Sequence, residues 1–407
     1  MLTASTSVFA QKAKQLGAPA QARAKFDPRA DERLNIGEDT APAPLATTAG
    51  QLIISEFRLR GPGGATDEFV ELYNTTGATL VTQASDASAG LGVAASDNVL
   101  RCTVPNGTSI PAGGHYLCTN SLGYSLSTYP AGNGTTATAN ATYTTDIPDN
   151  AGIGVFSSTT TFAAATKLDA VGSASEGNAD FKEGTGYPTL SAFNVEQTLY
   201  RDLKSGTPRD TGNNATDFLH VDTFATDAGM GSRLGAPGPE NLTSPIQRNA
   251  TVKASLVDSG AASTAAPNRV RDSTPNSCTG GANCALGTLT IRRKFTNTTG
   301  AAVTRLRFRI VDITTFSAPA GTADLRALTS TDVTVTLTGG GTTLVRGLTL
   351  EQPPNQPNGG GFNSSQAAGI VTAGTPIANG ASINVQFVLG VQQSGSYRFF
   401  VNVEALP

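Results

Sequence analysis

Two histidines, His115 and His220, are the only ones among 407 residues, so imidazole chemistry has few places to occur. Neither lies in a His-x-His ligand pair or in the Gly-x-Ser-x-Gly turn of serine hydrolases. We expect both to occupy ordinary strand or loop positions. The sequence therefore predicts no catalytic residue, no metal site and no cofactor-binding residue.

Four carboxylates lie close together near residue 60, namely Glu56, Asp67, Glu68 and Glu71. Carboxylates in pairs are the residue types of glycosidase chemistry. A carboxylate on a half-buried strand, however, needs a cationic or hydrogen-bonding partner. We favour this structural interpretation, in which Glu56 or Glu71 forms an ion pair with Arg201 inside the fold.

The four cysteines form two short-range pairs in the sequence, Cys102 with Cys118 and Cys278 with Cys284. This distribution predicts two local disulfides and an oxidising compartment. Four reduced, buried thiols are the alternative. Metal binding is disfavoured because neither spacing matches a zinc site and no histidine follows the second pair.

Two loops are rich in oxygen ligands, residues 146–150 and 210–217. Oxygen ligands suit Ca²⁺, but neither loop matches the D-x-[DN]-x-[DN]-G pattern. Asx-rich turns also form without an ion, through bonds between side chain and backbone. Ca²⁺ is therefore retained only as an alternative, and no cofactor is predicted.

One local basic stripe stands out in the second half of the chain. Arg305, Arg307 and Arg309 alternate with apolar residues, which predicts that their guanidinium groups emerge from one sheet face. Arg292 and Lys294 on the preceding strand have the same outward parity. Such a stripe can contact polysaccharide, phosphate or an acidic partner. The alternative is a solvated face with acidic cross-strand partners, because no aromatic residues are interleaved on it.

The composition favours short strands joined by polar turns. The chain has 45 glycines, 22 prolines, 14% charged residues and a net charge of −3. So weak a charge provides no general attraction to nucleic acid or to acidic membranes, and nucleic acid is disfavoured as a partner. No run of about 18 apolar residues occurs, so no membrane span is predicted.

The elements that must position these residues are predicted to be strands. Shorter strand candidates fill residues 51–241, and no segment has a sustained 3.6-residue period. Clean period-two alternation, typical of antiparallel strands with one solvated face, recurs in the second half at 289–295, 306–310, 333–337, 383–389 and 397–403. We therefore predict an all-β fold of two antiparallel β-sandwich domains, 51–241 and 246–407, with a Gly- and Pro-rich linker at 235–239 and 244–245.

The first 50 residues are predicted to lie outside both domains. Val8-Phe9-Ala10 before Gln11 has the pattern of a signal-peptidase site, so residues 1–10 are interpreted as the remnant of a signal peptide. Residues 11–50 are poor in large apolar side chains and predict an extended arm or linker. Such an arm either stays disordered or becomes ordered against a neighbouring subunit.

The opening of the first domain, Gln51 to Arg60 and Asp67 to Asn74, resembles the start of a lamin-tail domain. The resemblance continues in the family's order through Ile110-Pro-Ala-Gly113, His115-Tyr-Leu-Cys118, Gly152-Ile-Gly-Val155, Lys167-Leu-Asp-Ala-Val-Gly172, Leu199-Tyr-Arg201 and Gly235-Ala-Pro-Gly-Pro239. It implies an immunoglobulin-like sandwich and a binding or structural module more often than a catalyst. The C-terminal half is similar to repeat-like β domains of bacterial surface proteins.

Together these observations predict a non-catalytic, exported protein with a structural or adhesive role at the cell surface or in extracellular material. Self-association, or association with other surface proteins, is the expected mode of action, and a filament subunit is its most concrete version. The alternative is a binding module for polysaccharide or nucleic acid that uses the basic face around Arg307.

Overall fold

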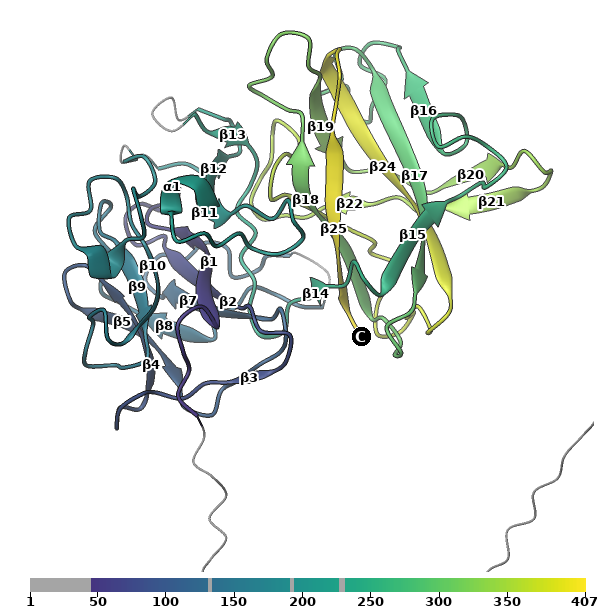
Figure 1. The fold of residues 1–407 in the computed structure, drawn as a ribbon. Helices are drawn as coiled ribbons and strands as arrows, with labels where there is room; N and C mark the ends of the chain where they lie inside the picture. Colours follow the sequence, from purple (N-terminus) through teal and green to yellow (C-terminus); the bar gives the residue numbers. More distant parts are fainter. Residues whose placement is uncertain (1–44, 131–133, 191–193, 227–230) are drawn as a thin grey trace, which may run out of the picture. The chain divides into compact units, whose positions relative to one another are not determined.

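The structure is a computed structural model that describes residues 45–130, 134–190, 194–226 and 231–407 (Figure 1). The fold is 40% strand and 2% helix, which confirms the expected all-β class. Helical structure in these residues consists of α1 (Asn214–Asp217) and the 3-10 turn η1 (Ala179–Phe181), and neither is long and apolar enough to cross a membrane. The expected signal-peptide remnant and nearly all of the predicted arm lie outside the described residues.

The first half of the described chain forms two main sheets, which we call the N-terminal sheet pair. The larger sheet has the strand order β13 (Arg233–Leu234), β12 (Phe218–Asp222), β11 (Gln197–Arg201), β1 (Leu52–Arg58), β2 (Phe69–Asn74), β7 (His115–Asn120), β8 (Ala141–Tyr143). The smaller has the order β10 (Lys167–Val171), β9 (Ile153–Phe156), β4 (Gly90–Ala95), β5 (Leu100–Pro105), and a separate ladder joins β3 (Leu80–Val81) to β6 (Ser109–Ile110). Leu52 and Val70 of the larger sheet share one core with Val93 and Val155 of the smaller, so the sheets pack face to face.

The second half forms two further sheets, the C-terminal sheet pair. One has the order β14 (Ile246–Gln247), β25 (Phe399–Leu406), β18 (Arg305–Ile313), β23 (Ser365–Ala367), β22 (Thr349–Leu350). The other has the order β15 (Val252–Leu256), β17 (Thr288–Asn297), β24 (Ser382–Gln393), β19 (Asp324–Leu328), with β16 (Arg269–Asp272) also paired to β17; β20 (Val333–Thr336) and β21 (Thr342–Val345) form a ladder of their own. Phe308 of the first sheet lies 4.7 Å from Phe295 and 5.0 Å from Phe387 of the second, between ring centroids, in a shared core.

Several strands are covered on both faces. Residues 45–407 form one compact unit, and β1, β2, β7 and β18 are buried along their whole length. Successive side chains of a strand point to opposite faces, so a strand that is buried throughout has no solvated face. The expectation of one solvated face per sheet, made for the second half of the chain, is therefore wrong for the sheet that contains β18.

The segment predicted as a linker is part of the packed interior. Residues 234–241, which we call the buried connector, are all buried. Gly235 forms an isolated bridge with Phe362, and a Cβ at Gly235 would lie only 2.3 Å from the carbonyl oxygen of Phe362. The chain changes from one sheet pair to the other here, but the glycine permits close backbone approach and does not mark an exposed hinge.

A buried asparagine forms the corner that follows β2, where the sequence reads Asn-Thr-Thr-Gly-Ala. Asn74 Nδ2 donates to the carbonyl oxygens of Ala78 and Ile110, both at 2.9 Å, and of Pro111 at 2.8 Å. Asn74 Oδ1 accepts a hydrogen bond from Thr76 N at 2.8 Å. This one side chain therefore satisfies the main chain of two loops that meet at the end of the strand.

The same corner recurs at the end of β17, again with the sequence Asn-Thr-Thr-Gly-Ala. Asn297 Nδ2 donates to the carbonyl oxygens of Ala301 and Ile377, both at 2.8 Å, and Asn297 Oδ1 accepts from Thr299 N at 3.0 Å. In its sheet β2 lies between β1 and β7, and β17 likewise lies between β15 and β24. The two sheet pairs therefore share a local template.

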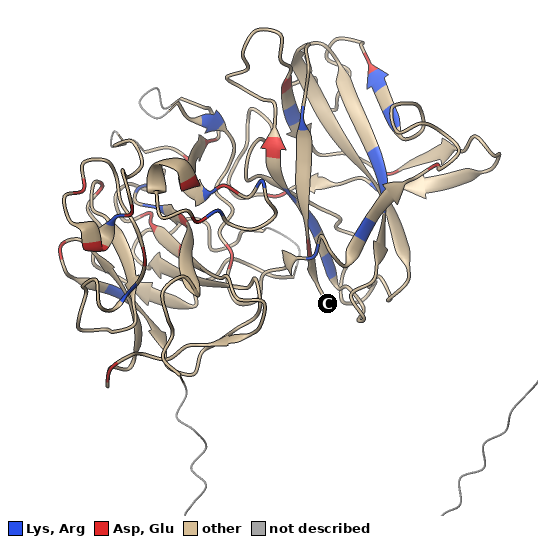
Figure 2. Ribbon diagram, viewed as in Figure 1, with Lys and Arg blue, Asp and Glu red and all other residues tan. Residues whose placement is uncertain are grey.

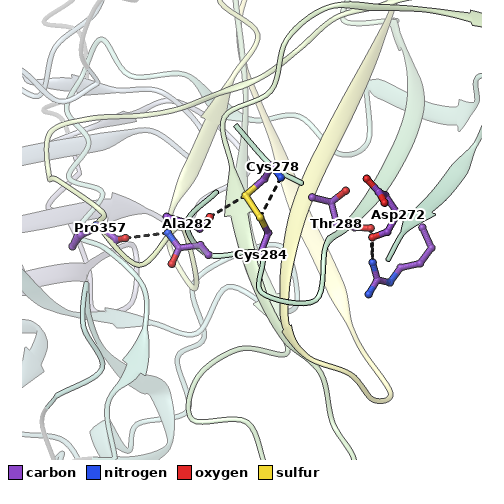
Figure 3. The surroundings of a disulfide bond; sticks show 8 residues. Asp272, Cys278, Ala282, Cys284, Thr288 and Pro357 are labelled. Carbon is purple, nitrogen blue, oxygen red and sulfur yellow. Dashed lines mark hydrogen bonds between the residues drawn. A yellow bond between two sulfur atoms is a disulfide. The ribbon is translucent and has the colours of Figure 1, made fainter. Parts of the chain in front are cut away.

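Both predicted disulfides are present, and no free cysteine remains. Cys102 of β5 and Cys118 of β7 join the two sheets of the N-terminal sheet pair inside their core. The Cys278–Cys284 bond closes a tight loop, in which Cys278 N lies 3.2 Å from Cys284 Sγ (Figure 3). Two disulfides are typical of proteins from oxidising compartments.

Candidate functional site

Arg305, Arg307 and Arg309 do not face solvent. They occupy alternate positions of β18, as the sequence pattern predicts, but their exposed fractions are 3%, 0% and 2%. Arg309 Nη1 donates to Gly238 O in the buried connector at 3.1 Å, and Arg307 lies over the ring of Tyr129 in the N-terminal sheet pair. The expectation that these arginines form an exposed contact for polyanions or partners is therefore wrong, because another layer of the protein covers their face of the sheet.

Arg292 and Lys294 do not join these three arginines. They lie on β17, which belongs to the other sheet of the C-terminal sheet pair. Figure 2 shows lysines and arginines in blue on strands of both sheets. Arg292 Nε donates to Gln386 Oε1 at 3.0 Å, and its Nη1 donates to Pro267 O at 3.0 Å. The five cations are thus divided between two sheets, and the predicted continuous stripe does not form.

Glu404 of β25 is the cross-strand partner of two of the arginines. In the antiparallel ladder, Arg307 stands directly opposite Glu404. The Glu404 carboxylate accepts from Arg307 Nε at 2.5 Å and from Arg309 Nε at 2.8 Å. Burial alone would raise the pKa of Glu404, but the two guanidinium groups hold it below its ordinary value.

Two further glutamates reach the arginines from outside the ladder. Glu351 Oε1 lies 2.7 Å from Arg305 Nη2, and its Oε2 lies 3.6 Å from Arg307 Nη1. Glu240 belongs to the buried connector, forms a salt bridge with Arg307 Nη2, and lies 3.3 Å from Arg309 Nη2. The connector thus contributes a carboxylate to the centre of the group.

Glu71 and His115 extend the group into the N-terminal sheet pair. His115 Nδ1 lies 2.9 Å from Glu71 Oε1, and His115 Nε2 lies 3.0 Å from Glu240 Oε2. Glu71 Oε2 also accepts from Glu240 N at 2.6 Å. Both ring nitrogens thus face carboxylate oxygens, so His115 links Glu71 of the N-terminal sheet pair to Glu240 of the buried connector.

Glu56 stands opposite Glu71 on the neighbouring strand β1. Its Oε1 accepts from Gly238 N at 2.9 Å, and its Oε2 accepts from Asn363 Nδ2 at 3.0 Å. Burial, and then repulsion by Glu71, raise the pKa of Glu56 from 4.5 to about 7, against the attraction of Arg309. Glu56 therefore keeps a proton at a pH where an exposed glutamate has lost it.

The resulting charge cluster pairs buried carboxylates with buried cations. We define it by five carboxylates, three guanidinium groups and one imidazole: Glu56, Glu71, Glu240, Glu351, Glu404, Arg305, Arg307, Arg309 and His115. Each guanidinium group has at least one carboxylate partner, and Glu56 adds no negative charge while it holds its proton. A buried set of ions needs such pairing, because desolvation of an unpaired charge is costly.

The cluster leaves little room for a ligand. A cavity lies beside Glu56, Glu71, His115 and Glu240, and the volume within it that the centres of water molecules can occupy is about 30 Å³. This volume holds one or two waters and is too small for a substrate. The ligand atoms of Glu71, His115 and Glu240 lie within 4.8 Å of one another, as in metal sites. Both histidine nitrogens already face carboxylates and Glu240 already pairs with arginine, so this arrangement fits the joining of the sheet pairs better than chemistry.

Arg201 belongs to a separate group of charges. The residue before Arg201 stands opposite Glu56 in the ladder, so the Arg201 side chain points to the other face of the sheet. There it pairs with Asp169 at 2.8 Å and Asp210 at 3.2 Å. The predicted ion pair of Arg201 with Glu56 or Glu71 is therefore wrong, since the partners lie on opposite faces.

The acids Asp67 and Glu68 lie outside the charge cluster. Asp67 forms a buried salt bridge with Arg58. Glu68 accepts from Asn120 Nδ2 at 3.0 Å and from Ile147 N at 2.8 Å, and burial raises its pKa to about 8. Each carboxylate has a hydrogen-bonding or cationic partner, as the structural interpretation of these residues predicts.

In the loops considered for Ca²⁺, carboxylates interact with arginines and with a main-chain N–H group. Asp149 forms a salt bridge with Arg60 at 2.9 Å. Asp217 accepts from Thr211 N at 2.7 Å and lies 3.4 Å from Arg201 Nη1. Because Arg201 already supplies positive charge to the second loop, we do not propose an ion there.

Sequence reasoning missed four residues of this region, namely Glu240, Glu351, Asn363 and Glu404. The alternation along the strand could have indicated Glu404. Its side chain points to the opposite face from that of Val403, which is the face that carries the β18 arginines. The alternative of acidic cross-strand partners anticipated such a residue. No sequence pattern indicates that Glu240 is buried, since it follows a Gly- and Pro-rich stretch that is typical of exposed linkers.

Comparison with protein-family models, with curated proteins and with solved structures finds no match for this chain. The resemblance of the first half to lamin-tail domains therefore stays a prediction. Function has to be argued from the geometry of the charge cluster and from the surfaces around it.

Proposed function

We propose that this protein is a non-catalytic structural or adhesive component of the cell surface or extracellular material, in which the charge cluster holds the two sheet pairs together as one unit. The proposal rests on one observation, namely that elements of both sheet pairs contribute side chains to the cluster. Its side chains come from β1, β2 and β7, from the buried connector, from β18 and β25, and from Glu351, which follows β22. Removing one partner while the rest of the cluster stays buried would leave a charge unpaired, which costs about 3–5 kcal/mol.

Domains of one chain ordinarily move relative to each other unless their interface is large and apolar. Here an apolar cluster reinforces the charges, since Tyr200 and Val221 pack with Ile310, Leu325 and Phe362. A structural subunit needs such a fixed arrangement in order to transmit load or to repeat in an assembly. The geometry therefore supports a scaffold more directly than a site with a moving lid.

We further propose that the N-terminal sheet pair is an immunoglobulin-like sandwich of the lamin-tail type. The antiparallel pairing of β1 with β2 and the core shared by two sheets support this assignment. The asparagine corner common to both halves supports a second sandwich built on a similar template in the C-terminal half.

Export to an oxidising environment is part of the same proposal, and the two disulfides support it. Self-association, or binding to other surface proteins, then provides the structural or adhesive action. A catalytic role is disfavoured because His115 is held between two carboxylates and both cysteine pairs are oxidised.

Electron microscopy and sedimentation velocity of the purified full-length protein test the structural role. Filaments, sheets or larger oligomers whose amount rises with protein concentration are expected. A protein that sediments as a monomer at every concentration and shows no ordered assembly on the grid would contradict the self-assembling version.

A further inference from the structure

The C-terminal sheet pair has an open, apolar margin between β25 and the strands β15 and β16. Two adjoining hollows of about 430 and 260 Å³ lie there, and Tyr397 lines both. Beside them, Phe400 is 56% exposed. We call this region the slot, and its floor consists of the apolar residues Val252, Ile291, Phe295, Phe387, Phe399 and Val401.

Strand edges border the slot. β15 and β16 pair with β17 on one side and with no described strand on the other. β25 pairs with β18, whereas β14 covers its outer edge only at Glu404 and Ala405. The main-chain N–H and C=O of Val403 both form hydrogen bonds on that outer edge. Phe399 and Val401 share the parity of Val403, so their main-chain groups point to the same edge. Such an edge can accept an added strand through main-chain hydrogen bonds.

Three arginines line the slot, and Arg271 lies beside the acid Asp272 on β16. Arg293 shares the parity of Ile291 and Phe295, which directs its side chain towards the slot, and burial lowers its pKa. Arg269 and Arg271 of β16 line the smaller hollow. Among the residues that the structure describes, none of the three forms a salt bridge within 4.0 Å. A partly buried cation of this kind gains most from a carboxylate ligand.

In the N-terminal sheet pair, the strand edge that corresponds to the open edge of β15 is covered by another strand. By the shared asparagine corner, β15 corresponds to β1 and β17 corresponds to β2. The outer edge of β1 carries β11, and Leu199 of β11 contributes to the core of that sheet pair. No described strand has this place beside β15, so the slot has the form of a site for one extended segment.

We propose that the slot binds an extended acidic segment, residues 31–39, from a second copy of the chain. The segment reads Asp31-Glu32-Arg33-Leu34-Asn35-Ile36-Gly37-Glu38-Asp39, so four acids and one arginine give it a net charge of −3. It lies outside the described residues, and only its sequence enters here. This inference rests on the self-association proposed above and assigns a contact to it.

Three features of that segment match the slot. In an extended chain, Leu34 and Ile36 point to the same side, where they can contact the apolar floor. The acids at both ends can pair with Arg269, Arg271 and Arg293, which gives specificity for an acidic strand. The main chain can bond to a free strand edge that borders the slot, that of β15 or of β25, which gives affinity that does not depend on side chains.

A peptide-binding experiment tests this inference. The host is the full-length protein carrying Leu34→Asp and Ile36→Asp, so that its own segment does not compete. The probe is a fluorescent peptide of residues 29–41 with the natural sequence, and binding is followed by anisotropy. We expect binding that Arg293→Gln weakens at least about tenfold and that Leu34→Asp with Ile36→Asp in the peptide abolishes.

Arg346→Gln is the matched control, because Arg346 pairs with the exposed Asp332 away from the slot. This variant should bind the peptide as the host does, and melting curves of all variants establish that they are folded. Where Arg293→Gln does not fold, Arg269→Gln serves in its place. Absence of binding, or equal affinity in the Arg293→Gln and Arg346→Gln variants, would overturn the inference.

Two further outcomes separate this inference from the proposed function. If dodecanoate displaces the peptide and binds more tightly in an Arg293-dependent manner, the slot takes acyl chains and the segment assignment is wrong. If the peptide does not bind while the wild-type protein still assembles on the grid, self-assembly stands and the slot is not its contact. If the peptide binds as expected while the wild-type protein remains a monomer, the slot assignment stands and the self-assembling function fails.

Discussion

Glu56 Oε2 accepts a hydrogen bond from Asn363 Nδ2 at 3.0 Å, across 307 residues of sequence. Glu56 lies in β1, the first strand of the described chain, and Asn363 lies two residues before β23 of the C-terminal sheet pair. Asn363 adopts a positive φ of 60°, and its Oδ1 accepts from Arg309 at 3.0 Å. Neither sheet pair therefore completes this group of polar contacts without the other.

Removal of the Glu240 carboxylate should destabilise the whole protein. Glu240→Ala leaves Arg307, Arg309 and His115 without one of their carboxylate partners, and we expect a loss of about 3–5 kcal/mol in the free energy of unfolding. Urea denaturation monitored by circular dichroism measures this change. Arg346→Ala, which breaks an exposed pair, is the control and should cost no more than about 1 kcal/mol. Equal losses in the two variants would show that the cluster does not hold the sheet pairs together.

The pKa of Glu56 predicts a contribution to stability that falls as pH rises. The folded protein keeps the Glu56 proton up to about pH 7, whereas the unfolded chain releases it near 4.5. Between these values the folded state binds more protons, so rising pH favours unfolding. Glu56→Gln cannot ionise, and its melting temperature should fall less than that of the wild type between about pH 5 and pH 8.

Glu68 supplies a reference for that measurement. Burial raises its pKa to about 8, so it contributes a slope of the same sign that persists in the Glu56→Gln variant. Glu68→Gln should therefore remove a different part of the slope, over a window that extends to higher pH. A Glu56→Gln variant whose melting temperature follows the wild-type pH profile would mean that Glu56 is ionised throughout.

The shared asparagine corner predicts matched losses in the two halves. Asn74→Ala and Asn297→Ala each leave buried carbonyl oxygens without a donor, and each should cost about 1–3 kcal/mol. Because the two corners share no partners, the double variant should show the sum of the two losses. Thr336→Ala, at an exposed strand position, should change stability by less than about 0.5 kcal/mol. Strongly unequal losses would argue against a common template.

The two disulfides should differ in what they contribute. Cys102–Cys118 closes a loop of 16 residues inside a core, and replacement of both cysteines by serine should cost about 3 kcal/mol or more. Cys278–Cys284 closes a loop of only 6 residues, so the same change there should cost about 2 kcal/mol. Chemical denaturation of the two double variants measures both values, and the reverse order would contradict the burial argument.

Much of the fold can be predicted from local patterns. Alternation of Leu306, Phe308 and Ile310 with arginines identifies the strand and its two faces, because side chains of a strand alternate. The spacing of cysteines within each half identifies both disulfides. Such patterns depend on neighbours in sequence, and the sequence contains them directly.

The environment of each face depends on distant segments, and this part could not be predicted. Nothing near Arg307 indicates that the buried connector and the N-terminal sheet pair cover its face. Glu240 lies in a Gly- and Pro-rich stretch whose composition suits an exposed linker equally well. The sequence predicts an ion pair of Arg201 with Glu56 or Glu71 because all three are charged strand residues, but it does not reveal the register that places Arg201 on the opposite face of the sheet.

Scanning calorimetry of the full-length protein tests most directly the claim that the charge cluster makes the two sheet pairs one cooperative unit. The account predicts a single transition whose van't Hoff enthalpy equals its calorimetric enthalpy, and which separates into two transitions in Glu240→Ala. Two resolved transitions in the wild-type protein, unchanged in position by Glu240→Ala, would contradict it.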